Sequence, residues 1–164
     1  MATGIGNQLT KQIGEYLACA ELGRRGYIAT TFSGNVPTYD LIAVDSRNRS
    51  FPVQVKAING GSWQFDATKF LEISFTSNDK QLVKKMIHLP HPDLICIFVN
   101  LAGQGKDEFF VFELRDLQKI IHANYKHWID IHDGIRPKNP KSTHVSVSAD
   151  DLKSYRNNWD LLNL

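Results

Sequence analysis

Hydrophobic residues along the chain recur at two kinds of spacing, and these spacings predict where helices and strands lie. Apolar residues three or four positions apart predict helices, whereas runs rich in β-branched and aromatic residues predict strands. The apolar face of the first helix is predicted from four residues: Leu9, Ile13, Leu17 and Ala20. Helices are predicted over residues 8–25, 79–87 and 114–125, with a last helix beginning near 148–150, and strands over 27–32, 39–45, 51–58, 70–75, 93–99, 109–113 and 145–147.

The run over residues 93–99 has a different character from the other expected strands. It is almost continuously apolar, which is typical of a strand buried on both faces of a sheet. The strands that come before it are separated by turn residues, which favours antiparallel pairing among them. Because helices flank and interrupt these strands, the sequence predicts an α/β fold with an antiparallel first part and a buried central strand.

Length and composition restrict the class of protein. The 164 residues are 42% hydrophobic and 22% charged, which is enough apolar material for one core. No apolar run approaches the roughly 20 residues of a membrane helix, and residues 1–7 lack the basic and apolar stretches of a secretory signal. Cys19 and Cys96 cannot form a disulfide framework or a zinc site. We therefore expect one cytoplasmic globular domain over residues 1–164, without a membrane partner.

The charge of the chain permits a nucleic-acid partner without requiring one. Nineteen Lys and Arg residues against seventeen Asp and Glu residues give a net charge of +2. This is far below the charge of a protein that coats nucleic acid with its whole surface, so any basic surface must be local. Two short basic clusters are present: Lys80, Lys84 and Lys85, and then Arg136, Lys138 and Lys141.

Polar residues within two neighbouring strands form the candidate site. The second and third strands are expected to make a hairpin around Asn48, and symmetric pairing then places Asp40 opposite Lys56. Alternation along the third strand puts Gln54 and Lys56 on one face. Strands rarely carry Asp at their centre, and Lys is rarely buried unless it is paired. The residues therefore form either a structural Asp40–Lys56 ion pair or a ligand site.

The first helix adds a carboxylate to this group. At 100° per residue, Glu15 has Ala18, Cys19 and Leu22 as its nearest C-terminal neighbours, so it lies on an apolar flank of the helix. An inward-facing carboxylate needs a partner. A bound hard cation, shared with Asp40 and an amide oxygen, would be such a partner.

In their order and strand context, these residues resemble the motifs of the PD-(D/E)XK nuclease superfamily, which includes restriction endonucleases and Holliday-junction resolvases. The acid on the first helix is Glu15, within GEYLA. The Asp that begins the second strand is Asp40, within GNVPTYDLI. The third strand carries Gln54 and Lys56, within VQVKA, where the family has an acid-x-Lys motif.

The resemblance implies a restriction-endonuclease-like core of helix, three strands, helix and strand around a mixed sheet, with helical additions at the C-terminus. It also implies a metal-dependent deoxyribonuclease, an endonuclease or a resolvase, that acts on DNA with Mg²⁺ or Mn²⁺. Lys56 would orient the attacking water and stabilise charge on the phosphate. A homodimer is the implied assembly, because such enzymes cut two strands with two subunits. Four groups would bind the metal: Asp40, the Gln54 side-chain oxygen, the Val55 carbonyl and, directly or through water, Glu15.

Gln54 departs from the family pattern, because it puts an amide where the family has Asp or Glu. An amide oxygen is still a hard ligand, but the site loses one negative charge and should bind a metal more weakly. Two alternatives to an active nuclease follow. One is an inactive nuclease-fold protein that binds DNA or acts as a scaffold. The other is an α/β domain without a nucleic-acid partner, whose Asp40–Lys56 pair is structural.

Outside the metal site, one aromatic and five basic residues are candidates for contact with DNA. Trp63 follows two glycines and could stack on a base; an aromatic side chain folded onto the core is the alternative. The basic residues could contact phosphates, although a solvated helix face also explains the first two. The candidates are Trp63, Lys80, Lys84, Arg136, Lys138 and Lys141.

Overall fold

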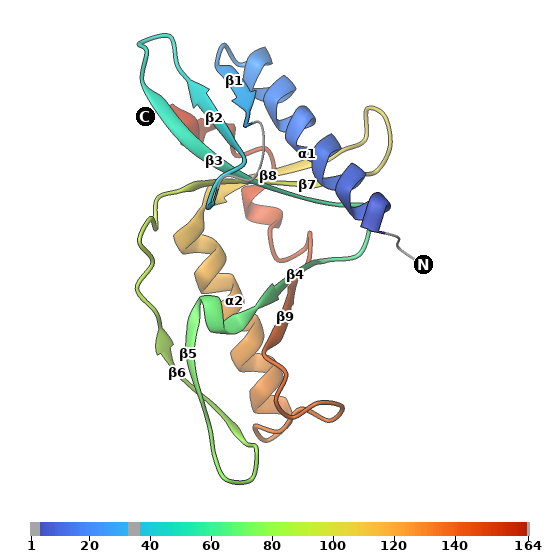
Figure 1. Cartoon of the computed structure of the whole chain (residues 1–164), viewed down its shortest axis with the longest axis vertical. Helices are drawn as coiled ribbons and strands as arrows, with labels where there is room; N and C mark the ends of the chain where they lie inside the picture. The colour runs from blue at the N-terminus through green and yellow to red at the C-terminus, as the bar shows by residue number, and fades with distance from the viewer. Residues whose placement is uncertain (1–3, 33–36, 164) are drawn as a thin grey trace.

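The structure, a computed structural model, describes residues 4–32 and 37–163. Five strands form a central sheet in the order β1-β2-β3-β7-β8. Neighbouring strands are antiparallel except for β3 and β7, which are parallel. The predicted α/β class and mixed sheet are therefore present (Figure 1). The strands of this sheet are β1 (Ile28–Thr31), β2 (Leu41–Val44), β3 (Ser50–Ile58), β7 (Ile95–Asn100) and β8 (Glu108–Glu113).

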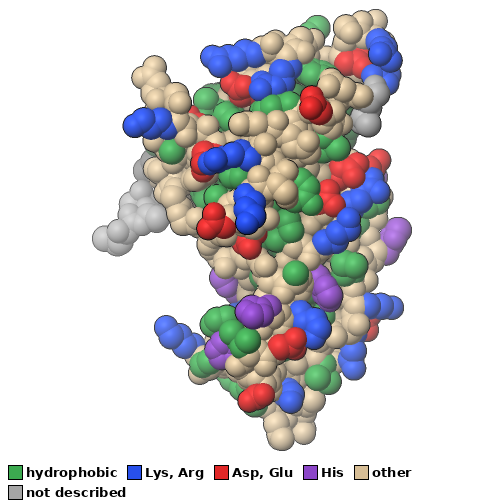
Figure 2. Space-filling view, turned by 180° about the vertical axis from the view of Figure 1, so that it is seen from behind, with side chains coloured by type: hydrophobic (Ala, Val, Ile, Leu, Met, Phe, Trp, Pro, Cys, Tyr) green, Lys and Arg blue, Asp and Glu red, His purple; other side chains and the backbone are tan. Residues whose placement is uncertain are grey.

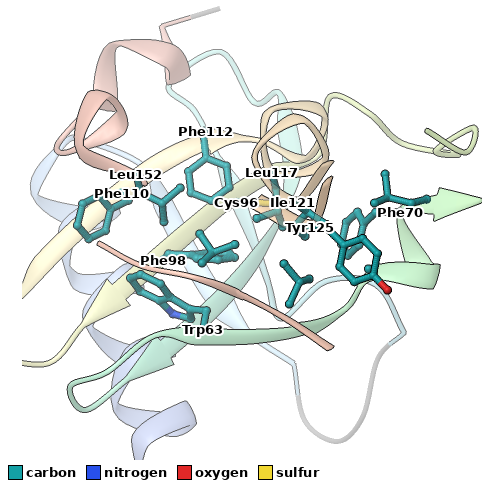
Figure 3. Packing of buried hydrophobic residues seen from close by; sticks show 14 of the residues in the cluster. Trp63, Phe70, Cys96, Phe98, Phe110, Phe112, Leu117, Ile121, Tyr125 and Leu152 are labelled. Atoms are coloured by element: carbon teal, nitrogen blue, oxygen red, sulfur yellow. The ribbon is translucent and has the colours of Figure 1, made fainter. Parts of the chain in front are cut away.

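The two long helices, α1 (Gly4–Arg24) and α2 (Leu114–Ile131), pack on opposite faces of this sheet. Along β7, Ile97 joins the apolar cluster on the α1 side and Phe98 joins the cluster on the α2 side. Figure 3 shows the residues that pack around Phe98 on the α2 side. Residues 95–99 are all buried, which confirms the strand that the apolar run predicts.

Two small antiparallel sheets lie beside α2, and the β5–β6 hairpin extends to the opposite end of the molecule from β1 and β2 (Figure 1). Between β3 and β7, strands of these two small sheets stand where the sequence predicts a helix. The short strand predicted at 145–147 is confirmed as β9. Its partner, the strand over residues 63–66, is not predicted by the sequence. The elements are β4 (Trp63–Asp66) with β9 (His144–Val147), β5 (Leu71–Phe75) with β6 (Gln81–Met86), and a 3₁₀ turn, η1 (Ala67–Lys69).

Residues 79–87 were predicted to form a helix, and this prediction is wrong because β6 occupies them. Asp79 has a φ of 57° and lies in the turn that reverses the chain after β5. Gln81 is then 1% exposed and Leu82 39% exposed, the alternation of a strand. The four-residue spacing of the lysines places them on one face of a strand as well as of a helix. Pairing with β5 decides between the two structures.

The first helix is confirmed, but it buries a different face from the predicted one. Leu9 and Ile13 are 52% and 45% exposed, whereas Ala18 is fully buried. The cause is a close approach of the helix to β3, since a Cβ added to Gly14 would lie 2.4 Å from the Cβ of Ala57. Apolar spacing does not reveal a contact that depends on the smallest residue of the helix.

The last helix predicted near 148–150 is replaced by two 3₁₀ turns, η2 (Lys153–Tyr155) and η3 (Trp159–Leu162). Asn157, between them, has a φ of 52°, which interrupts helical geometry. Trp159 still packs on the α1 side of the sheet. None of the helices in the described part of the chain has the length and apolarity to cross a membrane.

Candidate functional site

Asp40 lies where β2 and β3 separate. Its backbone N–H donates to the Val53 carbonyl at 2.9 Å, just before the ladder between the two strands begins. β3 continues beyond this point without β2, and the Asp40 carboxylate accepts the Val55 N–H at 2.9 Å. The carboxylate thus accepts a hydrogen bond from a β3 N–H that lies beyond the end of the ladder with β2. Because the N–H and C=O of one residue point to the same side of a strand, the Val55 carbonyl faces the same gap.

The predicted hairpin register around Asn48 is wrong by two residues, since Asp40 lies beside Val55 and not opposite Lys56. The turn is held by Asp45, whose carboxylate accepts two backbone N–H groups within the turn. This side-chain contact centres the turn on Arg47, one residue before the predicted centre at Asn48. A register change of two residues leaves every side chain on its predicted face, so the polar residues still meet.

Gln54 and Lys56 line a hollow of about 490 Å³ together with Asp40. Both side chains are half-buried. Within residues 4–32 and 37–163, neither side chain has a hydrogen-bond or ion-pair partner; the Lys56 ammonium lies 5.7 Å from the centre of the Phe65 ring. An amide and an ammonium group in this hollow are therefore available to a ligand.

Helix α1 contributes Glu15 and Lys11 to the same region. The Lys11 Nζ lies 3.3 Å from Asp40 Oδ1 and 3.5 Å from Glu15 Oε1. The acidic side chains are 16% and 17% exposed, and the lysine is 59% exposed. The close contact of Gly14 with Ala57 sets the height of the helix above β3. That height brings Lys11 into contact with Asp40, the residue that precedes β2.

Burial and the neighbouring charges together raise the pKa values of both Glu15 and Lys11. Burial raises the pKa of Glu15, and although Lys11 lowers it, Asp40 raises it further. Burial disfavours the charge on Lys11, but the Asp40 and Glu15 carboxylates outweigh it and raise the pKa of Lys11. Lys11 is therefore charged at neutral pH. The three side chains form one electrostatic unit across two elements.

The predicted Asp40–Lys56 ion pair is not formed. The cation that contacts Asp40 is Lys11, and among the described residues Lys56 pairs with no acid. The alternative of a structural Asp40–Lys56 pair is therefore wrong. The sequence prediction missed Lys11, although its position four residues before Glu15 is the spacing of a helical ion pair.

The oxygen donors at this site match a hard divalent cation. Asp40 and Glu15 supply carboxylates that already share one positive charge, and Gln54 and Val55 supply neutral oxygens. Nowhere in the described residues do three or more His, Cys, Asp and Glu side chains gather as metal ligands. A metal at this site would therefore depend on the amide and backbone oxygens. The residues fit Mg²⁺ or Mn²⁺, with a weak affinity expected from two carboxylates.

Trp63 belongs to the core and not to a binding surface. It is 3% exposed, and its ring packs 5.1 Å from that of Phe98 and 5.8 Å from that of Phe110, measured between ring centres. Its indole N–H donates to the Lys56 carbonyl at 3.2 Å. A base cannot stack on a ring buried in this way, so the predicted base contact is wrong. Trp63 instead holds the strand that carries Lys56.

The two basic clusters, which are distant in sequence, meet in the structure. The backbone N–H of Gln81 donates to the Gly134 carbonyl at 2.8 Å. The side chain of Lys80 lies against Gly134, where a Cβ would come within 2.5 Å of it. The β5–β6 hairpin is thereby joined to residues 134–142. Four of the predicted phosphate-binding residues are exposed there: Lys80, Lys84, Lys138 and Lys141.

Arg136 differs from these lysines because it is held by the fold. Its guanidinium lies 5.4 Å from the ring centre of Tyr125 and 5.9 Å from that of Trp128, and it donates to the His144 carbonyl. Its contact with phosphate stays a prediction. On the face in Figure 2, Lys and Arg side chains are interspersed with Asp and Glu, so no continuous basic patch covers that face.

A larger hollow, of about 750 Å³, also borders residues 38–39. The charged residues in its lining include an Arg115–Glu113 pair at 2.7 Å, and the Asp45 carboxylate accepts an Arg49 N–H at 2.7 Å. The hollow contains none of the predicted site residues. The smaller hollow is the better candidate because it brings together Asp40, Gln54 and Lys56.

No protein-family model matches this sequence, and no curated protein matches it either. Among solved structures, the fold is similar to that of a bacterial homing endonuclease, I-Ssp6803I, with a TM-score of 0.51 and 14% sequence identity. The match covers 94% of this chain and 91% of that chain. At this identity the similarity concerns the fold. The chain thus has a mixed α/β fold similar to that of a nuclease.

Proposed function

We propose that this protein is a metal-dependent deoxyribonuclease of the PD-(D/E)XK type, whose single domain over residues 1–164 hydrolyses DNA phosphodiester bonds. The observation that carries this proposal is the meeting of Asp40, Gln54 and Lys56 where β2 and β3 separate. The order of these residues resembles the superfamily, and the fold is similar to that of a homing endonuclease.

Asp40 is the central metal ligand in this proposal. Its Oδ2 accepts the Val55 N–H, which fixes the orientation of the carboxylate, as supporting hydrogen bonds do for metal ligands. A bound Mg²⁺ or Mn²⁺ would supply Lewis-acid stabilisation of phosphate charge and a more acidic water. The remaining ligands would be the Gln54 amide oxygen, the Val55 carbonyl and, directly or through water, Glu15.

Lys56 is the residue of this chain that would act on the reacting groups. Among the described residues no acid pairs with its ammonium group, so its charge is available to a phosphate. From the same hollow as Asp40, it would orient the attacking water and stabilise the charge that develops on the phosphate oxygens. The hydrogen bond from Trp63 to its carbonyl keeps this part of β3 in place.

The DNA would extend from the hollow toward the joined basic clusters. Gln64 lines the hollow and also a second one, of about 400 Å³, that reaches residues 142–144. Its side chain contacts His144, which links β4 to β9 along this route. Lysine contacts to phosphates would make binding strongly dependent on salt. The proposed phosphate contacts are Lys80, Lys84, Arg136, Lys138 and Lys141.

Charge balance favours one second candidate, an inactive nuclease-fold protein that binds DNA. The site contains two carboxylates and two lysines, so the net attraction for a divalent ion is small. Gln54 is the cause, because an acid at this position would shift the balance toward the metal. If the protein is active on duplex DNA, a homodimer is the proposed assembly, because two sites cut two strands.

Cleavage of linear, supercoiled, single-stranded and branched DNA, with Mg²⁺, with Mn²⁺ and with EDTA, tests the proposal. The wild type is expected to cut at least one of these substrates only when metal is present. Lys56→Ala is expected to lower the rate about 100-fold or more, because it removes the charge nearest the reacting phosphate. Lys119→Ala, which removes a 63% exposed lysine from α2, is the matched control and should cut like the wild type.

Each outcome separates the candidates. Metal-dependent cutting that is lost in Lys56→Ala and kept in Lys119→Ala establishes a nuclease and shows which DNA shape it prefers. DNA binding without cutting of any substrate establishes the inactive nuclease fold. The absence of both cutting and binding would refute a nucleic-acid function.

A further inference from the structure

A single lysine bridges the two carboxylates of the proposed metal site. Lys11 Nζ contacts Asp40 at 3.3 Å and Glu15 at 3.5 Å. One acid precedes a strand and the other lies on α1, so this ammonium group connects two elements. The lysine is 59% exposed and has a flexible four-carbon stem, so its ammonium group can move away without a change in the helix.

We propose that Lys11 is a displaceable cation, which occupies the carboxylate pair in the metal-free protein and leaves it when a divalent ion binds there. This inference rests on the proposed metal-dependent function. Lys11 is a positioning residue in this scheme, because it acts through Asp40 and Glu15 and not on the substrate.

The contacts of Asp40 explain why the lysine and a metal would compete. Its Oδ2 accepts the Val55 N–H, and its Oδ1 lies against the Lys11 ammonium, so both oxygens are engaged. A divalent ion bound at Oδ1 would lie close to a like charge, and the repulsion would be strong at that range. The ion therefore binds well only after the ammonium group has moved.

Gln54 reduces the advantage that a divalent ion has over the Lys11 ammonium group at this site. An acid at position 54 would add a negative charge that favours a divalent ion over a single ammonium group. With an amide there, both cations depend on the same two carboxylates. The displaced ammonium group would remain beside the hollow, where a DNA phosphate offers a new partner. Bound DNA should therefore favour the metal-bound state, and by reciprocity metal should favour bound DNA.

Calorimetric titration of MnCl₂ into the metal-free protein, without DNA, tests the inference. Lys11→Met removes the charge and keeps an unbranched side chain that favours helix. It is expected to lower the Kd for Mn²⁺ about tenfold, because the competing ion pairs and the repulsion are both lost. Lys126→Met is the matched control, because Lys126 pairs with Asp130 at the same i,i+4 spacing on α2. It should bind Mn²⁺ like the wild type.

Thermal unfolding is a second readout that does not involve cleavage. Without metal, Lys11→Met should have a lower Tm than Lys126→Met, because two neighbouring carboxylates lose their shared cation. MnCl₂ should then raise the Tm of Lys11→Met more than that of the wild type, since tighter binding stabilises the folded state more.

Gln54→Glu separates failure of this inference from failure of the proposed function. If the wild type and Gln54→Glu bind Mn²⁺ but Lys11→Met binds it no more tightly than the wild type, Lys11 is not displaced and the metal site stands. If none of these proteins binds Mn²⁺, Gln54→Glu included, the proposed metal-dependent function is wrong and the inference is wrong with it.

Discussion

Two glutamines in different regions of the molecule are used in opposite ways. Gln81, where the hairpin meets α2, is 1% exposed; its amide donates to the Pro140 and Ser142 carbonyls and its oxygen accepts the Tyr125 hydroxyl. Gln54, in the hollow beside Asp40, has no hydrogen-bond partner in the described part of the chain. Buried amides whose bonds are all internal belong to the fold. An amide without such bonds is available to a ligand.

The same contrast holds for the surroundings of the two glutamines. On α2 itself, the Gln118 amide also donates to two carbonyls, those of Phe70 and Ile87, both at 2.8 Å. Around Gln54, by contrast, the charged groups compensate one another through a single exposed lysine, and Lys56 pairs with no acid among the described residues. Burial alone therefore does not distinguish a site from a structural network. The completeness of the hydrogen bonding does.

The largest expected effect on stability comes from removing the Gln81 amide, with removal of the Gln54 amide as the comparison. Gln81→Leu should lower the free energy of unfolding by about 3 kcal/mol, because it leaves a buried hydroxyl and two carbonyls without partners. Gln54→Leu, the matched control, should change it by less than about 0.5 kcal/mol. Urea unfolding of the purified variants measures both. Equal losses would show that the two glutamines do not differ as the contacts indicate.

A smaller effect is expected at the contact that positions α1 over the site. Gly14→Ala places a methyl group 2.4 Å from the Cβ of Ala57, and this crowding should cost about 1–2 kcal/mol after the helix propensity of Ala is allowed for. Ala57→Gly removes the opposing methyl group, so the double variant should be more stable than the sum of the single effects. A double-mutant cycle by thermal unfolding measures the coupling. Simple additivity would mean that the two positions do not touch.

The smallest effect is expected from a capping carboxylate in the α2 region. Asp66 accepts the Thr68 N–H at 3.0 Å and the Thr143 hydroxyl at 2.8 Å, and the hydroxyl lowers the pKa of Asp66 below its ordinary 3.8. Asp66→Ala should cost about 1 kcal/mol at neutral pH. Because the pKa is lowered in the folded state, this stabilisation is full above the ordinary pKa and is lost as the pH falls through the lowered one.

Denaturant unfolding of the wild type and Asp66→Ala at about pH 7 and about pH 3 measures this dependence. The difference in the free energy of unfolding between the two proteins should be smaller at the lower pH. Thr143→Val removes one donor and keeps the cap, so it should have a smaller effect of the same sign. A difference that stays constant with pH would show that the charge of Asp66 does not contribute.

Local patterns were sufficient for part of the site. The neighbours of Glu15 at helical spacing predict a half-buried carboxylate, and alternation along β3 predicts that Gln54 and Lys56 share a face. Both predictions depend on distances of a few residues within one element. The same reasoning could not separate helix from strand at residues 79–87, because the spacing of the lysines suits both. There, the partner strand decided the structure.

The sequence by itself determined the class of fold, the buried strand at residues 95–99 and the polar face of β3, because helices and strands impose their own periods on local residues. Only the tertiary structure decided what Asp40 contacts. The turn at Asp45 set the register, and the contact of Gly14 with Ala57 set the height of α1. Such contacts join residues that are distant in sequence, and no local period records them. The ion pair between Lys11 and Asp40 is one of these contacts.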